Sequence, residues 1–331
     1  TSYFDTTISL KLYHTSSDDY DIEDIFTYFE ETISLYHQYM DKYHPYDDIN
    51  NVYTINHSDG PVVLDPILFD AIEYALVNEN IILVENTPLF NIALNPVLDI
   101  WHDARESDSC DYSIESGIAY CEVPKDLIDG QSFNTNPADI VLDDSSMTIS
   151  FLKENMSIDL GGMSKGYVSQ IIADHLNDLG VKFLLNNGNS NIVAGGVNPN
   201  NVDGLYYIAL TKPSTDAEIV SSYFIYLKIP EDMAVVSSGN YQRFFKGIDD
   251  HLVYHHIIDP FTYYPGGDSM SVTIIYPDSG LSDILSTAIY LLDQADALAF
   301  VESYPDLEAI WYDYNGTYTY SSGFEQYIYT P

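Results

Sequence analysis

The sequence predicts an α+β fold of mixed antiparallel sheets with packed helices, and three observations support it. Strand-like and helix-like segments follow one another irregularly, which favours α+β over a regular βαβ array. Several strand-like segments pair across short turns as hairpins. The 331 residues are 46% hydrophobic and show no internal repeat. A chain of this size and composition can bury the core of one large domain or two modest ones.

The amino-terminal segments predict one strand and two helices. Residues 4–14, "FDTTISLKLYH", alternate apolar and polar side chains and predict a strand. Residues 21–43 carry apolar side chains at helical spacing and predict a long amphipathic helix. Residues 65–80 predict a second helix, with Asp65 as its N-cap and Pro66 at its first position. Residues 88–106 give a mixed signal.

Residues 107–138 are polar and punctuated by Gly and Pro, which is typical of a loop insertion in the domain. This segment contains both cysteines of the chain, Cys110 and Cys121. A local disulfide between them would suit an oxidising compartment. Two unpaired thiols fit the sequence equally well.

The carboxy-terminal half is rich in strands. Residues 139–153 predict a hairpin, and residues 157–180 predict a strand, a glycine turn and a helix that ends at Gly180. A second hairpin crosses Asn315-Gly316 near the end of the chain. The other segments are a strand–turn–strand unit at 181–196, strands at 206–210, 222–229, 233–238 and 271–277, and a helix at 282–293.

The charge balance narrows the function. Asp and Glu number 51 against 11 Lys and Arg, a formal net charge of −40 at pH 7. Such a surface repels polyanions, so we expect no nucleic-acid partner. The acidic residues are best explained as a solvated shell. No run of eighteen apolar residues occurs, so we expect no membrane span in this chain. Because bases are scarce, each one near a candidate site is informative.

The stretch "DLGGMSKGY" (159–167) is the first candidate site. Paired glycines before a helix let backbone N–H groups approach a ligand, and the helix N-terminus favours an anion there. Lys165 at that end opposes the helix dipole unless an anion lies between them. A solvated lysine beside an ordinary glycine turn is the simpler alternative. The spacing is neither that of a P-loop nor that of a Rossmann motif.

Two further blocks offer ligands for a metal and a base. Asp283 and Thr287 stand four residues apart in a predicted helix, so both face one side and could supply oxygens to Mg²⁺, with Ser282 as a possible cap. Asp283 could equally complement the helix dipole while Thr287 packs. His256 near Asp259 fits a base with its orienting acid. It could also cap a turn.

A last block, "LLNNGNSNIVAGG" (184–196), places Asn and Gly at a strand end. Amide donors and bare backbone there suit a flat heteroaromatic ligand or a phosphate. An ordinary tight turn would have the same composition.

Taken in order, these blocks closely resemble the ApbE-type flavin transferases. The resemblance rests on "DLGGMSKGY", "LLNNGNSNIVAGG", "VVSSGNYQRFF", "YHHIIDPFTYYP" and "VTIIYPDSGLSDILSTAIYLL". It spans roughly residues 3 to 322 and is weakest at 107–138. It implies a single domain over residues 1–331, with an ApbE-like, T-fold-related α+β fold and FAD bound in a cleft.

The resemblance also implies a reaction. Members of this family use Mg²⁺ to cleave FAD, attach FMN to a Thr or Ser hydroxyl of an acceptor protein, and release AMP. The acceptor carries a Ser/Thr-Gly-Ala-Thr-like motif. Some members instead hydrolyse FAD to FMN and AMP, and a non-catalytic flavin-binding protein is a third reading. Many members act outside the cytoplasmic membrane, often as lipoproteins, so the resemblance implies an extracytoplasmic location and leaves open whether a lipid anchor preceded the chain.

Site roles follow from the resemblance residue by residue. Asp283 and Thr287 match the metal-binding side chains, and Asp283 is thereby essential for catalysis. His256 matches the histidine that would remove the acceptor proton. Ser164 matches the position whose backbone carbonyl binds the metal. The positions that match the cofactor site are Gly162, Lys165, Gly166, Asn186, Gly188, Asn189 and Asp259. Asp259 would orient His256 or shape its loop. Two acidic positions of the family pattern are replaced here, by Gln170 and Asn240.

Overall fold

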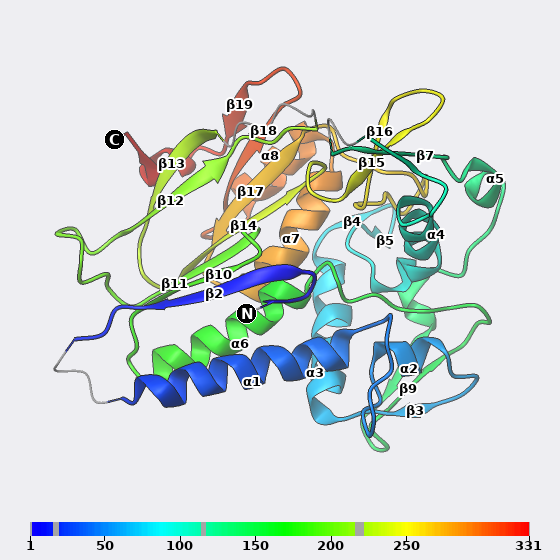
Figure 1. The fold of residues 1–331 in the computed structure, drawn as a ribbon, viewed down its shortest axis with the longest axis horizontal. Helices are drawn as coiled ribbons and strands as arrows, with labels where there is room; N and C mark the ends of the chain where they lie inside the picture. The colour runs from blue at the N-terminus through cyan, green and yellow to red at the C-terminus, as the bar shows by residue number, and fades with distance from the viewer. Residues whose placement is uncertain (1, 16–19, 114–116, 216–221, 331) are drawn as a thin grey trace.

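The computed structural model describes residues 2–15, 20–113, 117–215 and 222–330. Within these residues the chain forms an eight-stranded antiparallel sheet that runs through the middle of the molecule (Figure 1). Its strands, in spatial order, are β1 (Ser2–Tyr3), β2 (Thr6–Leu12), β10 (Phe183–Asn187), β11 (Asn191–Gly195), β14 (Met233–Gly239), β17 (Ser271–Tyr276), β18 (Glu308–Tyr312) and β19 (Tyr318–Tyr320). The predicted α+β class is confirmed.

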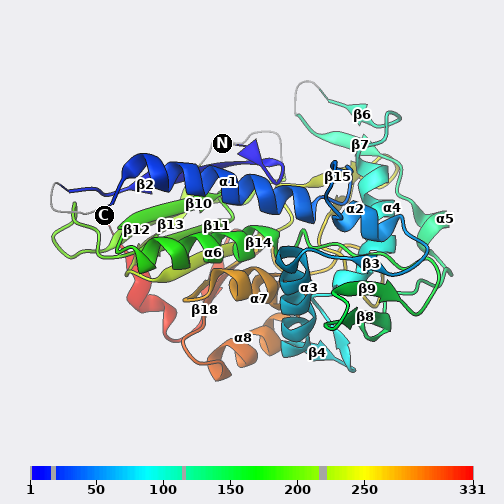
Figure 2. The same ribbon diagram turned by 90° about the horizontal axis from the view of Figure 1, so that it is seen from below.

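Helices cover one face of this sheet. Helices α6 (Ser164–Asp178) and α7 (Ser279–Leu291) pack directly on β11, β14 and β17, and α1 (Ile22–Met40) packs on α6. In Figure 2, which views the molecule from below, these helices lie in front of the strands, with α3 (Pro66–Asn78) and α8 (Gln294–Ser303) beside α7. The buried side chains between helices and sheet form the main hydrophobic core.

The opposite face of the sheet is covered by a smaller one. Strands β12 (Tyr206–Thr211), β13 (Tyr223–Ile229) and β20 (Ile328–Tyr329) form it. Its inward residues, including Ile208 and Leu227, join Val235 and Ile275 of the main sheet in a second core. Alternation of buried and exposed residues along β12 and β13 accounts for this placement.

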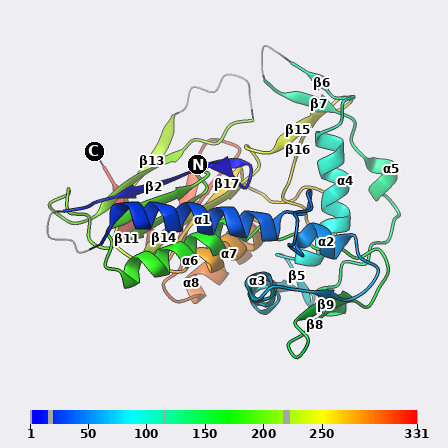
Figure 3. The same cartoon turned by 60° about the horizontal axis from the view of Figure 1, so that its bottom comes forward.

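A third region lies beside the sheet and forms one wall of the site described below (Figure 3). Helix α4 (Asn95–Arg105) packs there against a small sheet of β16 (Val253–His255), β15 (Phe244–Gly247), β7 (Ala119–Cys121) and β6 (Asp111–Tyr112). A disulfide joins Cys110 to Cys121. The predicted insertion at 107–138 therefore contains paired strands, because β7 runs parallel to β15.

Local signals account for the helix starts. Asp21 and Asp65 accept hydrogen bonds from the backbone N–H groups of Glu23 and Ile67, and Pro66 begins α3 as predicted.

The short elements are α2 (Val52–Asn56), α5 (Lys125–Ile128), β3 (Val62–Val63), β4 (Leu83–Val84), β5 (Thr87–Pro88), β8 (Ile140–Asp143), β9 (Thr148–Phe151), η1 (Glu79–Ile81), η2 (Ile92–Leu94), η3 (Pro137–Asp139) and η4 (Phe324–Tyr327).

Two predicted elements differ from the structure. The strand expected before the glycine turn, residues 157–160, does not form, although Asp159 donates its N–H to the Ile92 carbonyl. Helix α7 begins at Ser279 and not at residue 282, because Asp278 caps it by accepting from the Leu281 N–H. Ser282 is therefore not the cap. No helix in the described ranges has the length and hydropathy that crossing a membrane requires.

Candidate functional site

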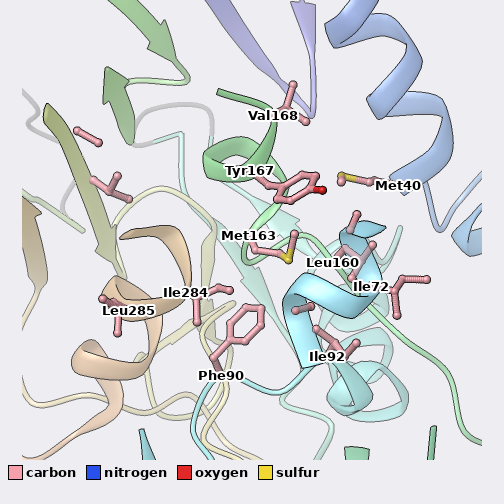
Figure 4. Packing of buried hydrophobic residues seen from close by; sticks show 14 of the residues in the cluster. Met40, Ile72, Phe90, Ile92, Leu160, Met163, Tyr167, Val168, Ile284 and Leu285 are labelled. Carbon is pink, nitrogen blue, oxygen red and sulfur yellow. The ribbon is translucent and has the colours of Figure 1, made fainter. Parts of the chain in front are cut away.

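The structure contains a cavity of about 440 Å³. It is bordered by the glycine turn before α6, the first turns of α7, the ends of β10 and β14, and the α4 wall. Figure 4 shows the apolar packing beneath the glycine turn, where Leu160 and Met163 point toward Ile72 of α3. Of the residues predicted from sequence, the cavity lining includes Gly162, Lys165, Gly188, His256, Asp283 and Thr287. Segments more than 120 residues apart in the sequence, around Gly162 and Thr287, thus form one site.

Asp283 is the buried acid of the cavity, with 6% of its surface exposed. Its Oδ2 accepts the backbone N–H of Gly166 at 2.7 Å, which ties α7 to α6. A Cβ on Gly166 would collide with the Ser279 carbonyl and lie 2.7 Å from the Asp283 Cβ, so only glycine permits this approach. Burial raises the pKa of Asp283, while Lys165 and the Gly166 N–H act in the opposite direction. Thr287 lines the same cavity.

Basic side chains gather around this acid. All eleven Lys and Arg residues lie in the described ranges, and four of them line the cavity: Lys42, Lys165, Arg105 and Arg243. Both arginines of the chain are among them. In a protein with a formal charge of −40, this concentration of cations is the electrostatic mark of an anion site. Burial lowers the pKa of Lys165, and the charge on Arg243 adds to that effect.

Two adjacent histidines line the cavity but differ in their bonding. The Nδ1 of His255 accepts the Ile257 N–H at 3.2 Å, and burial lowers the pKa of His255 to about 4. The ring of His256 is accessible from the cavity, and no hydrogen bond to it occurs among the described residues. Enclosure by the cavity walls, followed by the positive charge of neighbouring side chains, holds its pKa well below the ordinary value. His256 is thus neutral at pH 7.

Asp259 does not contact the His256 ring. Its Oδ1 accepts the backbone N–H groups of Phe261 and Thr262, at 2.7 and 2.9 Å. Of the two roles expected for Asp259, the contacts match shaping the loop and not orienting the histidine. Asp259 also lies outside the cavity lining.

The Asn/Gly block forms the turn between β10 and β11. Asn186 accepts the Asn189 N–H at 2.9 Å and donates to its side-chain oxygen at 2.8 Å. Neither asparagine lines the cavity, whereas Gly188 between them does, with a φ of 71°. The two asparagines therefore hold the turn that presents Gly188 to the cavity.

Ser164 and Gly166 stand just behind the cavity wall. The Ser164 hydroxyl donates to the Leu160 carbonyl at 2.7 Å, and its side chain is buried. Gly162 is the residue of this turn that faces the cavity, together with Gly161. The Gly166 N–H lies in the first turn of α6, where backbone N–H groups have no helical acceptor, and it donates to Asp283.

The two replaced acidic positions have structural roles away from the cavity. Gln170 accepts the Ser279 N–H at 2.7 Å and donates to Asp174 at 2.7 Å, so it joins α6 to the start of α7. Asn240 donates to the Tyr314 hydroxyl at 2.8 Å. Neither lines the cavity.

Several lining residues were missed from the sequence. Lys42, Asp159 and Arg105 face the cavity, as do the aromatic rings of Trp101 and Tyr254, which stack at 5.5 Å. The rarity of bases in this chain is the signal that could have identified Lys42 and Arg105. The aromatic wall carried no such signal, because its members come from distant elements.

The donor chemistry fits a hard cation. The described residues contain no cluster of three or more His, Cys, Asp or Glu side chains able to hold a metal. Among the residues that line the cavity, Asp283 and Thr287 supply a carboxylate and a hydroxyl from successive turns of α7. Oxygen donors in small number, completed by a ligand's own oxygens, are the coordination that Mg²⁺ prefers.

Comparisons with known proteins agree with this arrangement. The profile of the ApbE family matches residues 4–311. A FAD:protein FMN transferase of Klebsiella pneumoniae is 28% identical over 270 residues, which cover 79% of this chain and 74% of the relative. A protein of the same name from Treponema pallidum is 26% identical over 261 residues, covering 74% and 67%.

Solved structures show the same fold. The ApbE protein of Thermotoga maritima matches with a TM-score of 0.80 at 21% identity, over 100% of this chain and 98% of that protein. The flavin transferase ApbE of Vibrio cholerae matches with a TM-score of 0.73 at 20% identity, over 99% and 97%.

Proposed function

The chain belongs to the ApbE family, and from that premise we propose that it is a Mg²⁺-dependent FAD:protein FMN transferase. The hydroxyl oxygen of a Thr or Ser in an acceptor protein attacks the FMN-side phosphorus of FAD. A new phosphoester bond forms, the phosphoanhydride bond breaks, and AMP leaves. The hydroxyl proton passes to a base of the enzyme. The acceptor is expected to carry a Ser/Thr-Gly-Ala-Thr-like motif.

The observation that carries this proposal is that four of the eleven bases line the cavity that also contains Asp283 and Thr287. Elsewhere the protein repels anions, so this cavity is where a pyrophosphate can be held. Phosphoryl transfer depends mainly on positioning and charge stabilisation. Lys165 and Arg243, on the same cavity as Asp283, supply the fixed positive charge. A bound pyrophosphate would also oppose the lowering of the Lys165 pKa.

Asp283 and Thr287 would hold the metal through their side-chain oxygens. Ser164 remains the predicted carbonyl ligand, and Gly162, which lines the cavity, is a second candidate. When bound, Mg²⁺ would neutralise charge on the phosphates and on the leaving group. The Gly166 N–H fixes Asp283 in place, so that one carboxylate oxygen stays oriented.

His256 would remove the proton from the acceptor hydroxyl. Its ring is accessible from the cavity and its lowered pKa keeps it neutral, which is the state that accepts a proton. His255 is unsuited to this role because its Nδ1 already accepts a backbone N–H.

We further propose an extracytoplasmic location, with a lipid anchor as in many members of the family. The Cys110–Cys121 disulfide supports the location, since such bonds persist in oxidising compartments.

A direct assay tests the function. The protein is incubated with FAD and Mg²⁺, with and without an acceptor domain, and AMP, free FMN and protein-bound flavin are measured. We expect AMP with protein-bound flavin, both lost in EDTA. AMP with free FMN in the presence of a competent acceptor would identify a FAD pyrophosphatase. Intact FAD would overturn the proposal in favour of a flavin-binding protein.

Asp283→Ala should lower turnover by about 100-fold or more, because the metal loses its charged ligand. The matched control is Asp144→Ala, which removes an exposed carboxylate in the β8–β9 turn and should leave activity unchanged. Full activity of the Asp283 variant at saturating Mg²⁺ would contradict the metal assignment.

A further inference from the structure

Lys42 is a buried lysine just after the end of α1, at the edge of the cavity. Only 7% of its side chain is exposed. Its Nζ donates to three oxygens: Asn95 Oδ1 at 2.6 Å, Asp99 Oδ1 at 2.8 Å and Asp159 Oδ2 at 2.7 Å. An ammonium group has three N–H donors, so all of them are used. Lys42 therefore has no donor left for a bound phosphate, unlike the other cations of the cavity.

The partners of Lys42 belong to two elements that border the cavity, α4 and the glycine turn. Asn95 and Asp99 lie in the first turns of α4, the helix that also presents Trp101 and Arg105 to the cavity. Asp159 begins the glycine turn that leads to Lys165. One ammonium thus links the α4 wall to the turn that carries the phosphate-binding groups.

Asp159 connects Lys42 to the backbone of the glycine turn through its own hydrogen bonds. Its Oδ1 accepts the Gly161 N–H at 2.6 Å, and its own N–H donates to the Ile92 carbonyl at 2.9 Å. Gly161 and Gly162 follow directly and line the cavity. On the other side, Asn95 donates to Asp99 at 2.9 Å, which fixes the second carboxylate. A shift of Lys42 would therefore move both walls.

We propose that Lys42 is a positioning residue of the flavin-transfer site, which sets the spacing between α4 and the glycine turn and neutralises Asp159 where the anionic substrate binds. This inference rests on the proposed function. Asp159 lines the cavity with 18% of its side chain exposed, so without Lys42 it would add a negative charge facing the phosphates.

The ion pair stays charged over the whole working pH range. Although burial opposes it, the attraction of Asp159 raises the pKa of Lys42, and Lys42 with the Gly161 N–H lowers the pKa of Asp159. Loss of the pair by titration is thus excluded near neutral pH, and its contribution appears only on mutation.

The test compares Lys42→Met, which keeps the length of the side chain but removes the charge, with Lys42→Arg and with Lys125→Met. Lys125 is a matched control, since it pairs with Asp250 at 3.8 Å on the surface. The Kd for FAD is measured in EDTA, where no turnover occurs, and kcat and KM are measured with Mg²⁺. Melting temperatures are recorded for each variant.

We expect Lys42→Met to raise the Kd at least about tenfold and to lower kcat as well, because small misplacements across a site are costly. Lys42→Arg should recover most of the affinity, and Lys125→Met should equal the wild type. A Lys42→Met protein that melts earlier but binds FAD as tightly at low temperature would overturn the proposal, since Lys42 would then matter for stability alone.

A double-mutant cycle of Lys42→Met with Asp159→Asn tests the coupling between these two residues. If Lys42 acts through Asp159, the double variant should bind FAD no more weakly than the weaker single variant. Additive losses would overturn the proposal. Should Lys42→Met fail to fold, Asp99→Asn carries the test, because it removes the negative charge of one half-exposed partner of Lys42. It should raise the Kd severalfold, and an unchanged Kd would count against the inference. Wild-type protein that bound no FAD would overturn the proposed function itself.

Discussion

His256 shows how a single residue can be prepared for its reaction by its surroundings. Burial is the largest cause of its lowered pKa. The adjacent His255 and, from other elements, Arg243, Lys165 and Arg105 also disfavour a positive charge on its ring. The imidazole therefore remains a proton acceptor at pH values where an ordinary histidine would be half protonated.

For His256 we predict that transfer falls only when the pH drops through its lowered pKa, well below 6.5, because the protonated ring is no longer a base. His256→Ala should slow transfer by about 100-fold while the Kd for FAD changes little, and the acid limb should disappear. The measurement is kcat/KM against pH for both proteins. His57→Ala, at an exposed histidine that bonds the Tyr53 carbonyl, is the control. An equal loss of binding and transfer would show that His256 is not the base.

Individual site residues could be predicted from the sequence where the residue type is rare in this chain or where the spacing matches a helical turn. Lys165 was found because bases are scarce, and Asp283 with Thr287 because four residues make one helical turn. Asn186 and Asn189, which match cofactor positions of the family, bond to each other, and their contact with a cofactor stays a prediction. Nothing in the local pattern separates an amide that holds a turn from one that would hold a ligand.

At the scale of elements, the contact between α6 and α7 is the central feature, because it brings Lys165 and Asp283 onto one cavity. Gly166 permits the close approach, and Gln170 reinforces it by accepting the Ser279 N–H. The replacement of an acidic residue by Gln170 thus keeps an acceptor oxygen at that place.

We predict that Gly166→Ala destabilises the protein by about 1–3 kcal/mol, because the added methyl collides with the Ser279 backbone and Asp283. This cost exceeds the gain of up to about 1 kcal/mol that Ala brings to a helix. Gly60→Ala is the control, since its Cβ would meet nothing within 4 Å. Urea unfolding of both variants measures the difference. A Gly166→Ala protein as stable as the wild type would mean that the two helices can separate without loss.

Elements with strong local signals were predicted well, and those defined by distant partners were not. Helix α3 starts where Asp65 and Pro66 indicate. Residues 157–160 have a strand-like pattern but find no neighbouring strand to pair with, since Asp159 is turned toward Lys42 and Ile92. Strands β15 and β16 were missed because they are short, and β15 pairs with β7, more than 120 residues earlier.

For the whole molecule, charge is unevenly distributed in a way that composition alone does not reveal. Four of the eleven bases lie at the cavity, which leaves seven for the rest of a chain with 51 acidic residues. The body of the protein is therefore strongly anionic, whereas at the cavity the four bases outnumber the three lining aspartates, Asp5, Asp159 and Asp283. Added salt should therefore stabilise the anionic body of the protein but weaken anion binding at the cavity.

We predict that KCl stabilises the fold and weakens FAD binding at the same time. Screening shortens the range of repulsion from about 10 Å at 0.1 M to about 3 Å at 1 M salt, so the melting temperature should rise by about 5 °C over that interval at pH 7. The Kd for FAD should increase, because the same ions screen Lys165 and Arg243. The stabilisation should be smaller at pH 5, where protonated carboxylates repel less. A melting temperature that stays constant or falls with KCl would show that the acidic shell is not under electrostatic strain, and a Kd independent of salt would argue against cations as the anchor of the substrate.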